Sequence, residues 1–195
     1  MLTLALALLL GGCPQRIQVV TPSVRSTTAQ LSLSACGKRV AGPWRARVGY
    51  RGVSAHHREG DGTTPLGTYP IGPMVYGLDA NPGTRLRYHQ LVCGDWWDED
   101  PSSAAYNTFR HVPCGTRPPF GGGSEALWRA TVAYREFAVV EYNTSPAVPS
   151  RGSGIFLHDD TGHATNGCVS LPRFELLRVL RWLRPGAGVI SVRVA

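Results

Sequence analysis

Residues 152–171 read GSGIFLHDDTGHATNGCVSL and contain the most informative pattern of the 195-residue chain. A short apolar run, Ile155–His158, ends in a histidine, and Cys168 follows after a polar loop and a glycine. Short apolar runs that begin after glycines are typical of buried strands. We therefore predict that a strand places His158 at its end and that the loop returns the chain to Cys168.

These residue types suit thiol catalysis. A cysteine attacks a carbonyl as its thiolate, and a histidine within hydrogen-bond reach takes the proton and returns it to the leaving group. We expect a helix soon after Cys168, whose N-terminal dipole would favour the anion. Gly167 allows a close backbone approach to a substrate, so its amide region is a candidate donor to the oxyanion. The pattern makes Cys168 the candidate nucleophile and His158 its candidate base.

Outward from this segment, the chain has the signals of a mainly β domain with a few short helices. Glycine and proline number 23 and 15, a density that favours short strands and tight turns. Alternating or continuous apolar runs predict two strands within 30–53, a strand at Phe137–Tyr142 and a last strand at Val189–Val194. Helices are predicted at Ser124–Tyr134 and Leu171–Leu183, whereas 72–90 is predicted to be irregular.

The formal net charge of +7 comes almost entirely from arginine, since Lys38 is the only lysine. No long arginine run or zinc-finger or RNA-binding signature accompanies it, so we expect no nucleic-acid partner. A dispersed basic surface also suits an anionic cell wall.

The N-terminus resembles an export signal. Leu2–Leu10 is apolar except for Thr3 and too short to span a bilayer, and Gly11-Gly12-Cys13 resembles a lipoprotein cleavage site. We predict a lipoprotein-type signal peptide over 1–13, with membrane attachment through a lipidated Cys13. The polar stretch 14–30 is predicted to be a tether, and 31–195 to be the folded domain.

Four further cysteines follow in the chain. Cys93 and Cys114 flank a segment rich in aromatic, acidic and turn residues, and we predict that they form a disulfide in an oxidising compartment. Cys36 and Cys168 are left without a predicted partner, and an unpaired thiol in an exported protein is a candidate reactive group.

Two separated blocks also carry a family resemblance. The first, residues 57–71, reads HREGDGTTPLGTYPI, and the second extends from Glu141-Tyr142-Asn143 through Gly152–His158 to Gly167–Leu171. Together with Trp96-Trp97 and Tyr106-Asn107, they resemble the L,D-transpeptidase (YkuD-type) catalytic domain over about Leu31 to Val194. The resemblance implies a β-sandwich or barrel of that family.

The resemblance also implies roles for individual residues. Cys168 would be the nucleophile and His158 the base, with the Asp159 backbone orienting the imidazole. Tyr142, Asn166 and Ser170 would contact a peptidoglycan stem peptide, whose diamino acid would acylate Cys168 with loss of the terminal D-residue. An amine would then resolve the thioester. No cofactor or metal is implied. We expect a monomer in the cell envelope, in the periplasm or on the outer face of the membrane.

Departures from the family leave alternatives open. Better-known members have a histidine and an arginine where this chain has Asn166 and Ser170, so hydrolysis of the acyl-enzyme, a carboxypeptidase outcome, is an alternative to transfer. A second alternative is a non-catalytic peptidoglycan-binding lipoprotein, with Trp96-Trp97 as a stacking platform. A third is a zinc site formed by His158, Asp160 and His163.

Overall fold

A computed structural model describes residues 13–121 and 123–195. The predicted signal peptide therefore lies outside the described residues, apart from Cys13. No helix in the described part of the chain is long and apolar enough to cross a membrane.

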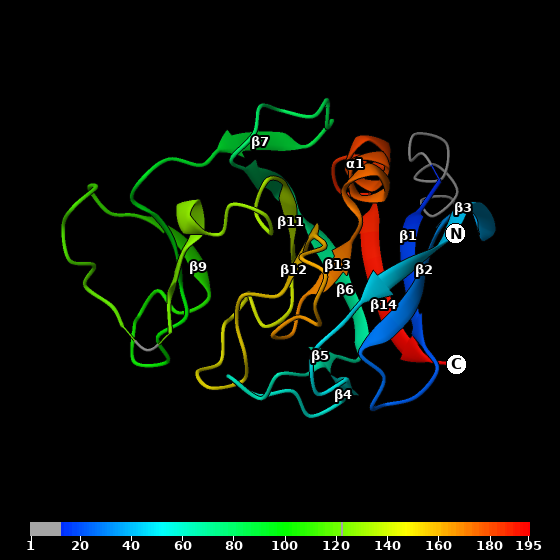
Figure 1. Cartoon of the computed structure of the whole chain (residues 1–195), viewed down its shortest axis with the longest axis horizontal. Helices are drawn as coiled ribbons and strands as arrows, with labels where there is room; N and C mark the ends of the chain where they lie inside the picture. The colour runs from blue at the N-terminus through cyan, green and yellow to red at the C-terminus, as the bar shows by residue number, and fades with distance from the viewer. Residues whose placement is uncertain (1–12, 122) are drawn as a thin grey trace, which may run out of the picture.

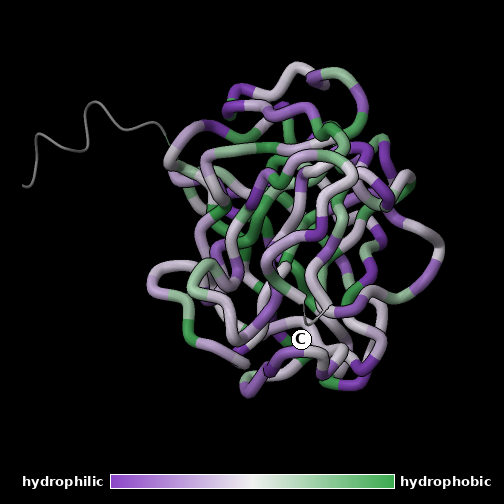
Figure 2. The backbone as a smooth tube through the Cα atoms, turned by 90° about the vertical axis from the view of Figure 1, so that its left-hand side faces the viewer, coloured by the Kyte–Doolittle hydropathy of each residue, from purple (hydrophilic) through white to green (hydrophobic). Residues whose placement is uncertain are grey.

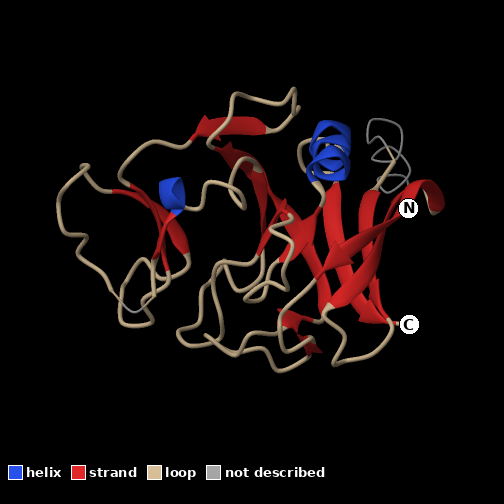
Figure 3. Cartoon of the chain, viewed as in Figure 1, coloured by secondary structure: helices blue, strands red, loops and turns tan. Residues whose placement is uncertain are grey.

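The secondary structure is dominated by strands, with one α-helix and one short 3-10 helix among the described residues (Figure 3). In chain order the elements are β1 (Gln15–Thr21), β2 (Thr28–Ala35), β3 (Lys38–Arg47), β4 (Val53–Ser54), β5 (Thr64–Pro65), β6 (Gly67–Gly77), β7 (Arg87–Gln90), β8 (Asp95–Asp98), β9 (Thr108–His111), β10 (Glu125–Ala126), η1 (Leu127–Arg129), β11 (Phe137–Val140), β12 (Phe156–Asp159), β13 (Val169–Leu171), α1 (Arg173–Trp182) and β14 (Gly188–Val194).

The main sheet curls into a barrel. Its strand order is β11-β12-β13-β3-β2-β1-β14-β6-β7, and an additional pairing of β11 with β6 closes the ring. Closure removes the free edges that an open sheet would expose. The remaining strands form a small sheet β10-β8-β9 and a two-stranded sheet β4-β5. The predicted fold class, mainly β and barrel-like, is confirmed (Figure 1).

The segment predicted to be a tether is instead part of the barrel. Strand β1 pairs with β14 in parallel and with β2 in antiparallel register, and Ile17 and Val19 are fully buried. The prediction missed this strand because its alternating residues, QRIQVVT, are half polar. In a strand with one buried face, that alternation is the expected pattern.

Cys13 also departs from its prediction, since it forms a disulfide with Cys36 in the turn between β2 and β3. Lipidation would alkylate the same sulfur atom, and one sulfur cannot carry both bonds. The prediction of a lipid anchor at Cys13 is therefore corrected to a disulfide, and Cys36 is not the free thiol that we expected.

Helix α1 lies against one end of the barrel and buries its apolar stripe there (Figure 1). Leu176, Val179 and Leu180 on this helix, followed by Leu183, are fully buried and belong to the main core with residues of β1, β2, β13 and β14. Hydrophobic segments accordingly gather in the middle of the molecule (Figure 2). The predicted C-terminal helix and final strand are confirmed within a few residues.

An insertion between β7 and β11 carries the small sheet and packs a second, aromatic cluster against the barrel. The cluster comprises Leu91, Trp97, Leu127, Tyr134, Phe137, Val139, Phe156 and Cys168. The Cys93–Cys114 disulfide forms within the insertion, which confirms the predicted pairing. Trp97 is buried in the cluster and Trp96 packs edge-on against Phe120 and Trp128, so the two rings do not form a shared stacking platform.

Two local predictions are wrong. The segment Ser124–Tyr134 contains the short strand β10 and the 3-10 helix η1, not an α-helix, because Glu125 and Ala126 pair with β8. The region 72–90, predicted to be irregular, contains the second half of β6 and all of β7. In both places tertiary pairing overrides the local signal.

Candidate active site

The two sequence blocks meet at the backbone of Cys168. Thr64, from the first block, donates a hydroxyl hydrogen bond of 3.1 Å to the Cys168 carbonyl oxygen, and Thr165 donates another of 2.6 Å. The Thr64 hydroxyl in turn accepts the Gly49 amide at 2.8 Å. A network of buried hydrogen bonds thus holds the cysteine backbone in one position, as a preorganised nucleophile requires.

The Cys168 thiol lies at the junction of the aromatic cluster and a pocket. Its sulfur donates to the Gly154 carbonyl oxygen at 3.2 Å and accepts the Phe156 amide at 3.3 Å. Burial, followed by the Glu125 carboxyl, raises the pKa of this thiol. Cys168 precedes strand β13, and α1 begins only at Arg173, so the expected helix dipole does not act directly on the sulfur.

The register of β12 and β13 pairs His158 with Ser170, so His158 projects from the same face of the sheet as Cys168, two residues before Ser170. His158 is only 6% exposed, and its ring packs edge-on against Tyr134. Burial lowers its pKa to about 4, so the imidazole is neutral at physiological pH. The structure, which describes both residues, contains no hydrogen bond between His158 and Cys168.

The Asp159 backbone makes the contact that the family resemblance implies. Nδ1 of His158 lies 2.7 Å from the Asp159 carbonyl oxygen. Because a carbonyl can only accept, Nδ1 carries the hydrogen and Nε2 is left as the acceptor. The Asp159 carboxyl is itself buried, and burial together with Glu136 raises its pKa to about 7.

Gly167 adopts a backbone conformation with φ +148°, in the region that favours glycine. A Cβ at this position would lie 3.1 Å from the Thr63 carbonyl oxygen. Its amide donates to the Thr165 hydroxyl at 3.2 Å. Since this amide already has an acceptor, its role as an oxyanion donor stays a prediction.

A pocket of about 400 Å³ opens beside Cys168 and has an acidic wall. Glu59, Glu99 and Glu125 line it together with Asn166 and Cys168. Burial, reinforced by Glu125, raises the pKa of Glu99 to about 9, so this carboxyl is protonated at neutral pH. Glu125 accepts a hydrogen bond from Tyr134, and Glu59 accepts one from Ser153 at 2.7 Å.

The three predicted substrate-binding residues are not equivalent in the structure. Asn166 is exposed and lines the pocket. Tyr142 lies in an adjoining groove of about 1020 Å³, where its hydroxyl donates to the Arg151 carbonyl oxygen at 2.8 Å. Ser170 is only 1% exposed, and its hydroxyl has no hydrogen-bond partner among the described residues, so direct contact with a substrate is not supported there.

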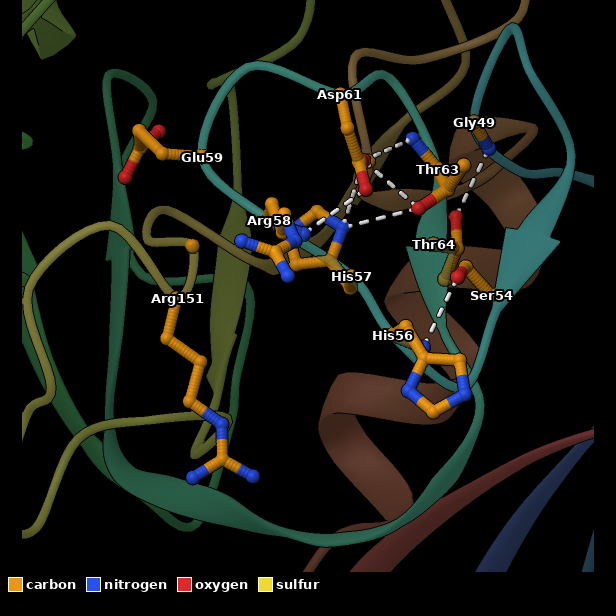
Figure 4. Close-up of polar contacts among 12 residues, drawn as sticks. Gly49, Ser54, His56, His57, Arg58, Glu59, Asp61, Thr63, Thr64 and Arg151 are labelled. Atoms are coloured by element: carbon orange, nitrogen blue, oxygen red, sulfur yellow. Dashed lines mark hydrogen bonds and ion pairs between the residues drawn. The ribbon is translucent and has the colours of Figure 1, made fainter.

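His57, for which the sequence pattern predicted no role, lines both the pocket and the groove. Figure 4 shows its ring directed at Asp61 and Thr63, in the loop between β4 and β5. Nδ1 lies 3.0 Å from Asp61 Oδ1 and 3.1 Å from the Thr63 hydroxyl oxygen. One sequence feature could have identified His57 as a site residue, which is its position at the start of the first block, directly before the glycine-rich residues.

The alternative zinc site is not assembled. Asp160 pairs with Arg47 at 2.9 Å, His158 is directed to the Asp159 carbonyl, and His163 is exposed. Among the described residues, no group of three or more His, Cys, Asp or Glu side chains is arranged to hold a metal ion.

Comparison with known proteins places this geometry in a family. Residues 23–194 match the model of the L,D-transpeptidase catalytic domain, YkuD. No curated protein matches the chain. Among solved structures, the helical cell shape determining protein Pgp2 (K307A mutant) from Campylobacter jejuni is similar at 13% identity, with a TM-score of 0.43. The alignment covers 94% of this chain and 48% of that one, so the chain spans about half the length of that protein. On the family match over most of its length, the chain belongs to the L,D-transpeptidase catalytic-domain family of peptidoglycan enzymes.

Proposed function

We propose that this protein is an exported L,D-transpeptidase in which Cys168 forms a thioester with a peptidoglycan stem peptide. The observation that carries the proposal is the position of Cys168, whose backbone is held by both motif blocks while the residue lines a pocket. A buried cysteine with a purely structural role would not require a pocket at its surface. The stem peptide as substrate is supported by the family match.

In the proposed acylation, His158 Nε2 takes the Cys168 thiol proton as the sulfur attacks the carbonyl of the L-centre of the diamino acid. The carbon–nitrogen bond to the terminal D-residue then breaks, and the leaving amine takes the proton from His158. Hydrogen bonds in a free enzyme often tighten only in the substrate complex. The neutral state of His158 supports its role as a base, because only neutral imidazole accepts a proton.

The acidic wall of the pocket supports a substrate with an amine. Stem peptides carry a diamino acid, whose side-chain ammonium would face the carboxyls of Glu59, Glu99 and Glu125. A positive charge near Glu99 and Glu125 would favour their ionised form and offset the cost of their burial.

The disulfides support export. Cys13–Cys36 and Cys93–Cys114 both require an oxidising environment, whereas cytosolic thiols are kept reduced. We therefore propose a location in the cell envelope, where peptidoglycan is also found.

The test is incubation with a tetrapeptide stem, with and without an amine acceptor, followed by mass analysis of protein and products. We expect a Cys168 acyl-enzyme, release of the terminal D-residue, and a new amide with the acceptor. Cys168→Ala should abolish all three while its thermal unfolding stays close to that of wild type. Hydrolysis products alone would replace transpeptidase by carboxypeptidase, and turnover by Cys168→Ala would exclude the thiol mechanism.

A further inference from the structure

Two histidines, His57 and His158, are buried in the described part of the chain. His158 lines neither the Cys168 pocket nor the adjoining groove, whereas His57 lines both. His57 is nevertheless 7% exposed, so its ring is held in place by its surroundings. A buried imidazole at the junction of two cavities requires an explanation beyond packing.

The hydrogen bonds of His57 determine its tautomer. Thr63 donates its hydroxyl hydrogen to Asp61 Oδ1 at 2.7 Å, so its oxygen is left to accept. Both atoms that face Nδ1, the Asp61 carboxylate and the Thr63 oxygen, are therefore acceptors. Nδ1 must carry the hydrogen, and Nε2 is left with a free lone pair. This is the arrangement in which a carboxylate orients a catalytic imidazole.

The ring lies between two glycines, with Cε1 facing Gly167 and Nε2 facing Gly152. A Cβ placed on Gly167 would lie 3.6 Å from Cε1 of His57, the atom bonded to both ring nitrogens. On the other side, a Cβ on Gly152 would overlap Nε2 and Cδ2. Glycines at both positions allow the ring to fit between Gly152 and the segment that carries Cys168.

We propose that His57, oriented by Asp61, is a second general base, which deprotonates the nucleophile that resolves the acyl-enzyme. The inference rests on the proposed function, because it requires a thioester on Cys168. His158 would serve acylation from the aromatic side, and His57 would serve the second step from the groove side. A peptide amine that approaches along the groove would pass Nε2 before it reaches the thioester.

The acceptor nitrogen, or a water oxygen, forms a bond to the thioester carbonyl carbon while its proton moves to Nε2 of His57. The carbon–sulfur bond breaks, the electron pair returns to Sγ of Cys168, and the thiolate takes the proton back from the imidazolium. No further reactant is needed.

The groups around His57 favour this role. Burial lowers its pKa, while Asp61 and Glu59 on the same loop act in the opposite direction. From the segment after β11, the Tyr142 ring packs edge-on against the imidazole at 5.3 Å between centroids. The lowered pKa keeps the imidazole neutral near pH 7, as a base must be.

The experiment separates the two chemical steps by intact-mass measurement after rapid quenching, with a tetrapeptide stem as donor. We expect His57→Gln to form the Cys168 acyl-enzyme within a few-fold of the wild-type rate and to resolve it ~10²–10⁴-fold more slowly, as for removal of a general base. Hydroxylamine, which attacks thioesters without a base, should release the adduct equally fast in both proteins. His163→Gln, an exposed histidine that lines neither the pocket nor the groove, is the matched control and should behave as wild type.

If His57→Gln does not fold, a second variant tests the same inference. Asp61→Asn places an amide against Nδ1, which permits the opposite tautomer, so resolution should slow and its pH dependence should change while acylation does not. Imidazole added to His57→Ala should restore part of the lost rate. Wild-type resolution by His57→Gln, or loss of acylation alone, would overturn the inference. Absence of any adduct on wild-type protein would overturn the proposed function together with it.

Discussion

The two sides of Cys168 are built differently. On one side, β12 and β13 hold His158 and Phe156 by regular strand pairing, and Tyr134 covers them. On the other side, loops supply His57 and Glu59, and the insertion supplies Glu99 and Glu125. The strand side is a buried aromatic cluster, whereas the loop side is a pocket lined by polar side chains. In the proposed mechanism, the strand side would activate the thiol and the loop side would contact the substrates.

The largest expected effect lies on the strand side. His158→Ala should reduce the acylation rate of Cys168 by ~10²–10⁴-fold, because it removes the proposed general base, which strand pairing holds in place. The measurement is the rate of covalent adduct formation with a carbapenem, an acylating probe that the family resemblance suggests.

His163→Ala is the matched control for this variant. His163 is exposed in the loop between β12 and β13, so its loss should leave acylation within a few-fold of wild type. The reverse ranking of the two variants would show that the base has been misassigned, and the contrast between the two sides of Cys168 would then fail.

A second test removes a covalent constraint from the loop side and leaves the strand side unchanged. Replacing Cys93 and Cys114 by serine removes a disulfide with a sequence separation of 21 residues, which should cost about 3 kcal/mol of unfolding free energy. The insertion that this disulfide tethers also carries Glu99. We therefore expect slower turnover of a stem peptide, measured by product formation, in addition to a lower melting temperature.

The Cys13–Cys36 disulfide provides the comparison for that test. Its sequence separation is 23 residues, so serine replacements should cost a similar free energy, but it joins β1 to the turn after β2. At a temperature where both variants are folded, only the Cys93/Cys114 variant should lose turnover. Equal losses in both would mean that the loop side does not depend on the insertion.

The smallest effect concerns the protonation of Glu99. Its pKa is raised from 4.5 to about 9 in the folded protein, chiefly by burial. Between these pH values the folded state retains a proton that the unfolded state releases, so the stabilising effect present below about pH 4.5 is lost as pH rises toward 9. Glutamine has no proton to lose, and Glu99→Gln should therefore gain melting temperature relative to wild type as pH increases.

The measurement is a series of thermal unfolding curves between pH 5 and 9. Glu175→Gln, on α1 and outside the pocket lining, controls for the general effect of removing a carboxyl. A constant difference between Glu99→Gln and wild type across this range would mean that Glu99 ionises normally, and that the pocket is wetter than the structure indicates.

Predictions from the sequence succeeded where a pattern is local. The apolar run before His158, the stripe of leucines in α1 and the closely spaced Cys93 and Cys114 each lie within a short segment, and all three are confirmed. Predictions failed where pairing with a distant segment decides the outcome. Strand β1 exists because β2 and β14 flank it, and β10 exists because β8 lies beside it.

The sequence by itself determined the mainly β class, the family resemblance, and the candidate pair His158 and Cys168. Only the tertiary structure decided which other groups surround the thiol. His57 and Glu99 lie far from Cys168 along the chain, and loop conformations that depend on packing bring them to one pocket. The partner of Cys13 was likewise decided by sheet pairing, which brings the start of β1 to the turn after β2. The physical reason is that strand periodicity is encoded locally, whereas the contacts of loop side chains arise only after the barrel has closed.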